Sequence, residues 1–111
     1  MARLKTSLWV SALVRRINDR GDFCVIARKG DPDAGQIWVE VDHLNGTMSL
    51  YSPAPANPDA EGREFVLRFD RVEAMKIGER LAQEAEFDPD FWVVSVETRN
   101  DDIGLEVVSS L

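Results

Sequence analysis

The segment Arg-Lys-Gly-Asp-Pro-Asp-Ala-Gly-Gln, residues 28–36, separates two apolar runs in a chain of 111 residues. The runs are residues 23–27 before it and residues 37–41 after it. Glycine, proline and aspartate reverse a chain, so this segment predicts a tight connection between two strands. Charge also changes sign here, because residues 1–30 hold seven Lys/Arg and two Asp/Glu whereas the rest holds six and eighteen. The segment is therefore both a strand connection and a charge boundary.

Before this segment, the pattern predicts a helix over residues 6–20, with Thr6 or Ser7 as its cap. Apolar residues recur every four positions in it: Trp9, Leu13 and Ile17. Gly21 follows, where a left-handed residue would end the helix. A second helix is predicted between Asp70, as its cap, and Asp88. Its apolar stripe includes Gly78, for which we expect close contact with a sheet.

Strands are predicted where apolar residues alternate or run together between turn residues. They cover residues 23–29, 36–42, 48–51, 64–69 and 91–98, and a further short strand at 103–108 is expected to pair back with 91–98. Asn45-Gly46 is a strong hairpin signal between the second and third strands. Alternation places Trp38 on the polar face of its strand.

Together these elements predict one α+β domain over residues 1–111. We expect a mostly antiparallel sheet of about five strands with two helices on one face. The order along the chain is α-β-β-β-β-α-β, with a possible last short strand. The residues predicted to be buried in the core are Leu13, Ile17, Val25, Val39, Leu81, Val94 and Val96.

Composition excludes several classes of protein. A single cysteine, Cys24, rules out an internal disulfide and lies in an apolar run, so it is interpreted as a buried hydrophobic residue. A single histidine, His43, is expected at the surface, and no metal or other cofactor is predicted. The net charge of −7 argues against nucleic-acid binding. No apolar run approaches the ~20 residues needed to span a membrane, and no signal peptide is recognised, so we expect a cytoplasmic protein.

The 28–36 segment is also the candidate functional surface. Its polar side chains, with the nearby tryptophan, form a candidate ligand or partner surface: Arg28, Lys29, Asp31, Asp33, Gln36 and Trp38. The spacing does not match a calcium-binding EF-hand loop or a phosphate-binding glycine loop. No hydrolase motif is present either, so no catalytic residue is assigned and an enzyme is not favoured.

A turn is the simpler interpretation of the same segment. An Asx-Pro-Asp sequence occurs three times, at residues 31–33, 57–59 and 88–90. The first side chain can accept a hydrogen bond from the main chain two residues on, and proline restricts the next φ. Local structure alone thus explains these residue types, and we prefer it to ligand binding.

Three runs of the chain resemble a family of small alphaproteobacterial proteins of unknown function. They are residues 8–16, residues 28–35 and residues 87–94. The resemblance extends over nearly the whole chain, and Gly-Asp-Pro-Asp-Ala-Gly is its most specific part. It implies a bacterial cytosolic protein and transfers no catalytic residue.

The expected function is a non-enzymatic protein-interaction module that associates with itself, as a dimer, or with another protein. Trp38 on a polar face is the reason for expecting self-association, because exposed aromatic residues anchor interfaces. The alternative, given equal weight, is that Trp38 lies under the proline-rich loop of residues 52–63. The basic first 30 residues are expected to meet an acidic helix, either in a second copy or in the same chain. The alternative is a small-molecule-binding protein or enzyme that uses the 28–36 loop beside Trp38. A ligand-sized pocket there would favour the alternative, and an exposed apolar strand edge would favour interaction.

Overall fold

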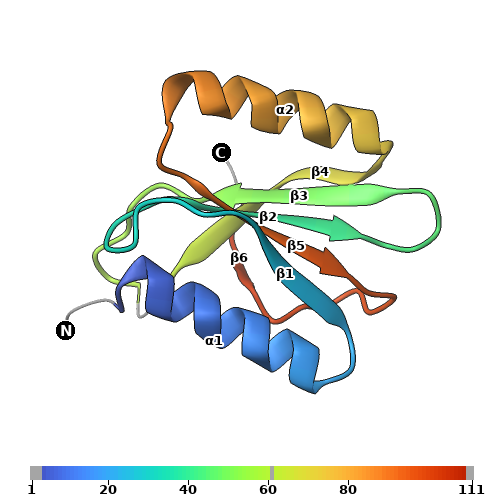
Figure 1. Ribbon diagram of the computed structural model, residues 1–111, viewed down its shortest axis with the longest axis horizontal. Coiled ribbons are helices and arrows are strands. Elements are labelled where there is room, and N and C mark those ends of the chain that lie inside the picture. Colours follow the sequence, from blue (N-terminus) through green and yellow to red (C-terminus); the bar gives the residue numbers. More distant parts are fainter. Residues whose placement is uncertain (1–3, 61, 110–111) are drawn as a thin grey trace.

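A computed structural model describes residues 4–60 and 62–109 of the chain, which form two helices and a sheet of six strands (Figure 1). The α+β class and the predicted order of elements, including the last short strand, are confirmed. The elements are α1 (Thr6–Asp19), β1 (Phe23–Arg28), β2 (Ile37–Asp42), β3 (Met48–Pro53), β4 (Glu64–Val72), α2 (Ala74–Phe87), β5 (Trp92–Glu97) and β6 (Glu106–Val107).

The strands lie in the order β1-β5-β2-β3-β4-β6. Three of the five pairings are antiparallel, as expected, whereas β2 with β5 and β4 with β6 are parallel. The expectation that the last strand pairs with β5 is wrong. Both edges of β5 are already occupied by β1 and β2, so β6 pairs instead with the start of β4.

The helices cover opposite faces of the sheet, which corrects the expectation of a single face (Figure 1). The central strands are apolar on both sides. Val39 and Val94 face α1, whereas Trp38 and Val93 face α2. Both faces therefore need a cover, and one helix on each face supplies it.

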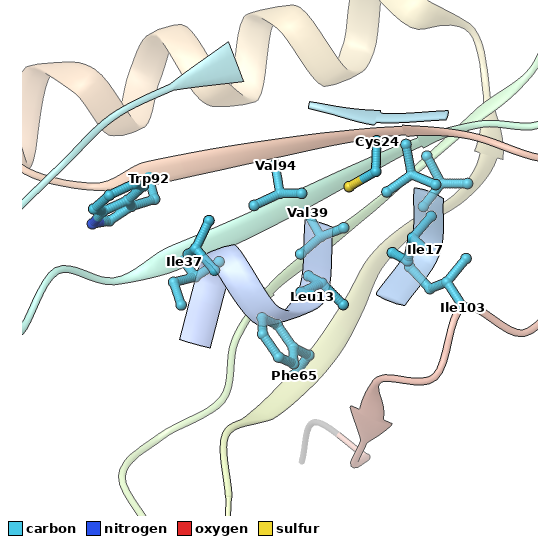
Figure 2. Close-up of a cluster of buried hydrophobic side chains, with 12 residues drawn as sticks. Leu13, Ile17, Cys24, Ile37, Val39, Phe65, Trp92, Val94 and Ile103 are labelled. Atoms are coloured by element: carbon cyan, nitrogen blue, oxygen red, sulfur yellow. The ribbon is translucent and has the colours of Figure 1, made fainter. Parts of the chain in front are cut away.

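The larger core lies between α1 and the sheet. Figure 2 shows Leu13 and Ile17 of α1 pointing into a cluster that includes Val39, Val94 and Phe65. The prediction of burial is confirmed for Leu13, Ile17, Val39, Val94 and Val96. Cys24 is buried in the same cluster, as expected.

Two predicted core residues are less buried than expected. Val25 is exposed because β1 is an edge strand whose α2-side surface carries no helix. Leu81 is only partly buried, and Ile77 is the residue of α2 that is fully enclosed. Gly78, expected to touch the sheet, is exposed, and a Cβ there would have no atom within 4 Å.

The helix ends also differ in part from the expectation. Gly21 has φ of 96° and ends α1 as predicted. At α2 the predicted cap Asp70 lies inside β4, which continues to Val72, and the helix begins after Glu73. Over the described residues 4–60 and 62–109, neither helix has the length and apolar character needed to cross a bilayer.

Candidate functional site

The 28–36 loop is joined to the turn before β5 by main-chain hydrogen bonds. The Asp31 N–H donates to the Asp90 carbonyl at 2.9 Å, and the Trp92 N–H donates to the Gln36 carbonyl at 2.8 Å. The indole Nε1–H of Trp92 donates to the Asp31 carbonyl at 2.8 Å. Two Asp-Pro-Asp turns far apart in sequence, at 31–33 and 88–90, therefore form one connected unit.

The same loop supplies the cap of α1. The Ser7 N–H donates to the Pro32 carbonyl at 2.9 Å, and the Thr6 N–H donates to the Asp33 carbonyl at 3.3 Å. The Thr6 hydroxyl donates to the Gly35 carbonyl at 3.0 Å. The predicted side-chain cap by Thr6 or Ser7 is therefore wrong. Carbonyl groups of the loop satisfy helix N–H groups that would otherwise have no partner.

Gly30 and Gly35 are required for close packing rather than for a left-handed backbone. The described glycines with positive φ are Gly21, Gly46 and Gly104. A Cβ at Gly35 would lie 2.8 Å from the carbonyl oxygens of Asp31 and Asp90. A Cβ at Gly30 would overlap the Asp90 carbonyl oxygen. The two turns can approach each other only because both positions lack a side chain.

The charged side chains of the loop mostly serve local structure. Asp31 accepts a hydrogen bond from the Ala34 N–H at 2.9 Å, three residues on, whereas Asn57 and Asp88 accept from the N–H two residues on, as predicted. Asp33 lies 3.6 Å from the Lys5 ammonium group, and both side chains are exposed. The Arg28 guanidinium lies over the Phe91 ring, 4.4 Å from its centroid, and donates to the Pro89 carbonyl at 3.0 Å.

The remaining predicted site residues do not join a common surface. Lys29 and Gln36 are exposed, whereas Trp38 is only 4% exposed. Trp38 lies under α2, with the Arg80 guanidinium 4.8 Å from its ring centroid and the Phe91 ring 6.5 Å away. The expectation of an exposed Trp38 is wrong because α2 covers its face of the sheet.

The cavity next to the loop is small. It has a volume of about 60 Å³ and is lined by Gln36, Ile37, residues 53–56, Arg63, Glu64 and Phe65. Such a space holds a few water molecules, whereas small-molecule sites are typically about 300–1,000 Å³. Among the described residues, no group of three or more His, Cys, Asp or Glu side chains is placed to hold a metal. Among the described residues, the cavity beside the loop is thus smaller than a typical ligand site and does not favour the ligand-binding alternative.

A buried serine and a histidine form a pair that sequence reasoning missed. The Ser49 Oγ and the His43 Nε2 are 2.7 Å apart, the separation of a nucleophile and its base. Ser49 is only 1% exposed, however, and its Oγ accepts the Arg71 N–H at 3.0 Å. Arg71 has φ of 52° in β4, so the buried serine supports an irregular point of the sheet.

An apolar surface lies along β1 instead. Phe23, Val25 and Ile26 are 53%, 39% and 41% exposed. Phe23 also lines an open depression of about 400 Å³ whose other rim carries the exposed Leu44. We call Phe23, Val25 and Leu44 the β1 surface, because Ile26 points to the opposite face of the strand, the α1 side. The sequence showed β1 to be apolar on both sides but gave no sign that it lies at the edge of the sheet.

The depression beside the β1 surface is polar at its base. The Thr98 hydroxyl, followed by the side chains of Arg20 and Asn100, holds the pKa of the Asp22 carboxyl below its usual value. Arg20 and Asp22 are 2.7 Å apart. These partners keep Asp22 charged and fixed at the start of β1.

Comparison with known proteins matches residues 4–106 to the family described as "Protein of unknown function (DUF1491)". The solution structure of protein Atu0922 from A. tumefaciens is 37% identical, with a TM-score of 0.86, and the match covers 99% of this chain and 98% of that one. The crystal structure of a DUF1491 family protein from Caulobacter crescentus is 33% identical, with a TM-score of 0.80 and coverage of 97% and 100%.

An NMR structure of a DUF1491 family protein from Caulobacter crescentus is 34% identical, with a TM-score of 0.81 and coverage of 98% and 100%. Among curated proteins, none matches the chain. The predicted resemblance to an alphaproteobacterial family is confirmed by these matches. The chain belongs to the DUF1491 family of proteins of unknown function.

Proposed function

We propose that this protein is a non-enzymatic interaction module that associates with a second copy of itself through the β1 surface. The observation that carries the proposal is the exposure of Phe23 and Val25, two residues apart on the same face of an edge strand. Adjacent exposed apolar side chains at a sheet edge are typical of contact surfaces. The proposal keeps the expected self-association but replaces its anchor, since Trp38 is buried.

The electrostatic contact expected between the basic start of the chain and an acidic helix does not form within one chain, because α1 and α2 lie on opposite faces. The cations of α1 have nearer partners. Lys5 pairs with Asp33, and the Arg16 guanidinium donates to the Gly104 carbonyl at 3.3 Å. The apolar β1 surface therefore supports association better than the charge of α1 does.

The size of the surface sets the strength of the contact. Burying a whole Phe, Val or Leu side chain contributes about 1.5–3 kcal/mol, so the exposed half of each contributes roughly 1 kcal/mol. Association costs at least about 4 kcal/mol in lost translational and rotational freedom. Summed over both copies, the exposed side chains contribute about 4–6 kcal/mol, only slightly more than this cost, so we expect a weak, reversible dimer rather than a permanent one.

Sedimentation velocity over a concentration series tests the proposal. The wild type should shift from one subunit mass toward two as concentration rises. The double variant Phe23→Ser/Val25→Thr should keep one subunit mass at concentrations where the wild type dimerises. Met75→Ser is the matched control, because Met75 is an exposed apolar residue on α2 outside the β1 surface. A wild type that stays at one subunit mass throughout would contradict the proposal, as would a Phe23→Ser/Val25→Thr variant that dimerises normally.

We propose a cytoplasmic location for the module as well. The similar proteins come from bacteria, and a single buried thiol without a disulfide suits a reducing compartment. Fractionation of the native host with an antibody against the chain would test this. Recovery from the periplasmic fraction would contradict it.

A further inference from the structure

The side chain of Asn18, near the end of α1, is bonded to the main chain of the edge strand. Its Nδ2 donates to the Cys24 carbonyl at 2.9 Å, and its Oδ1 accepts the Cys24 N–H at 2.9 Å. Both main-chain groups of one strand residue are thus bonded by one amide side chain. A neighbouring strand would use the same two groups in a sheet.

The strand register shows which way these groups point. Cys24 lies opposite Val96 in the antiparallel pair of β1 and β5. The N–H and C=O of a strand residue point to the same side, and alternate residues point to opposite sides. Since Asn18 bonds both groups of Cys24, they point away from β5 and toward the open edge. Ile26, two residues further on, presents its main chain to the same edge.

We propose that Asn18 is an edge cap that prevents a second copy of this chain from extending the sheet along β1. The proposal refines the proposed function, because it explains why association through the β1 surface would rest on side chains alone. Asparagine suits this role because its amide offers a donor and an acceptor at once. At the other end of the strand, the register shift between Ile26 and Arg28 interrupts the regular edge.

The β1 strand of a second copy has the right register to pair at the edge where Asn18 is bonded. If β1 of a second copy runs antiparallel about Val25, Cys24 of each copy lies opposite Ile26 of the other. Both residues present their main chain to the edge, so each of these two pairs would make two N–H···O bonds. Each pair includes a Cys24, and Asn18 therefore obstructs both.

Removal of the amide provides the test. Asn18→Ala should raise the self-association constant about tenfold or more in sedimentation velocity, because main-chain bonds become available to the second copy. Asn18→Asp retains the acceptor for the Cys24 N–H but loses the donor, so its association constant should lie between those of the wild type and Asn18→Ala. Ser11→Ala, on the exposed side of α1, is the matched control and should behave as the wild type.

Amide hydrogen exchange measured by NMR tests whether the main-chain groups on the open edge of β1 are hydrogen-bonded. At dilute, monomeric concentration the Cys24 amide should exchange faster in Asn18→Ala than in the wild type. At high concentration the amides of Cys24 and Ile26 should both become protected. If Asn18→Ala does not fold, Asn18→Asp supplies the same comparison with one of the two bonds retained.

An unchanged association constant in the folded Asn18 variants would overturn the proposal, as would protection of Cys24 that does not depend on residue 18. The result is separable from the test of the proposed function. A monomeric wild type with a dimeric Asn18→Ala would sustain the edge cap and refute self-association as the function. The opposite outcome is a wild-type dimer that is lost in Phe23→Ser/Val25→Thr and is unaffected by Asn18→Ala. It would support self-association as the function and refute the edge cap.

Discussion

Replacing Gly35 by alanine should destabilise the protein far more than the loss of one loop glycine usually does. The new Cβ would lie 2.8 Å from the carbonyl oxygens of Asp31 and Asp90, and 2.8 Å from Cδ1 of Trp92. Ordinary contact begins at 3.4 Å, so the loop must move by several tenths of an ångström. None of the three atoms belongs to a flexible side chain, since two are main chain and Trp92 is buried.

The size of the destabilisation follows from the packing and hydrogen bonds that this movement disturbs. Overpacking of a rigid site costs about 1–3 kcal/mol. The movement also lengthens the hydrogen bond from Trp92 to Asp31 and the bond from Thr6 to Gly35, each worth about 1 kcal/mol. Gly35→Ala should therefore lower the free energy of unfolding by about 2–4 kcal/mol, a large share of the ~5–15 kcal/mol of a typical domain.

Urea denaturation followed by far-UV circular dichroism measures this free energy. Gly78→Ala is the matched control, because Gly78 is exposed in α2 and a Cβ there meets no atom within 4 Å. That change should stabilise the protein by about 0.5–1 kcal/mol through helix propensity. The reasoning is refuted if Gly35→Ala unfolds at the same urea concentration as the wild type, or if both alanines shift the midpoint in the same direction.

Three further predictions concern the core. Trp38→Ala should lower the unfolding free energy by about 3–5 kcal/mol in urea, and a folded variant of near wild-type stability would mean that α2 does not cover Trp38. Ile77→Ala should cost about 2–5 kcal/mol and Leu81→Ala less, because only Ile77 is fully enclosed; equal losses would contradict this packing. Burial raises the pKa of the Cys24 thiol from 9.0 to about 11, so stability should hold below pH 9 and fall as the pH rises toward 11. Cys24→Ala should reduce that fall without abolishing it, because burial also raises the pKa of Tyr51; an identical alkaline profile in both proteins would refute the assignment.

Much of the fold could be predicted from local pattern. Residues four apart in α1 and alternating residues in β2 identify the elements because each period follows from backbone geometry. The Asn45-Gly46 hairpin was recognised for a similar reason, and the structure places it between β2 and β3. Local signals of this kind depend only on neighbours in sequence.

The predictions that failed all depend on partners distant in sequence. The alternation of residues in β2 predicts the face on which Trp38 lies. It does not predict that a helix from residues 74–87 covers that face. Composition shows turn residues at 28–36, but not that their carbonyls cap α1 or that Gly35 meets Trp92. Composition likewise does not reveal that Asp31 and Arg28, chosen for their polarity, make contacts within the fold.

The position of β5 has a consequence for synthesis of the chain. β5 is the last long strand to leave the ribosome, yet it lies between β1 and β2 and is the strand that joins them. Until residues 92–97 emerge, β1 is unpaired on both sides and has no link to the sheet formed by β2, β3 and β4. Folding must then close contacts across about seventy residues of sequence, a separation that slows folding. The nascent chain therefore presents Phe23, Val25 and Ile26 to solvent and to chaperones for most of its translation.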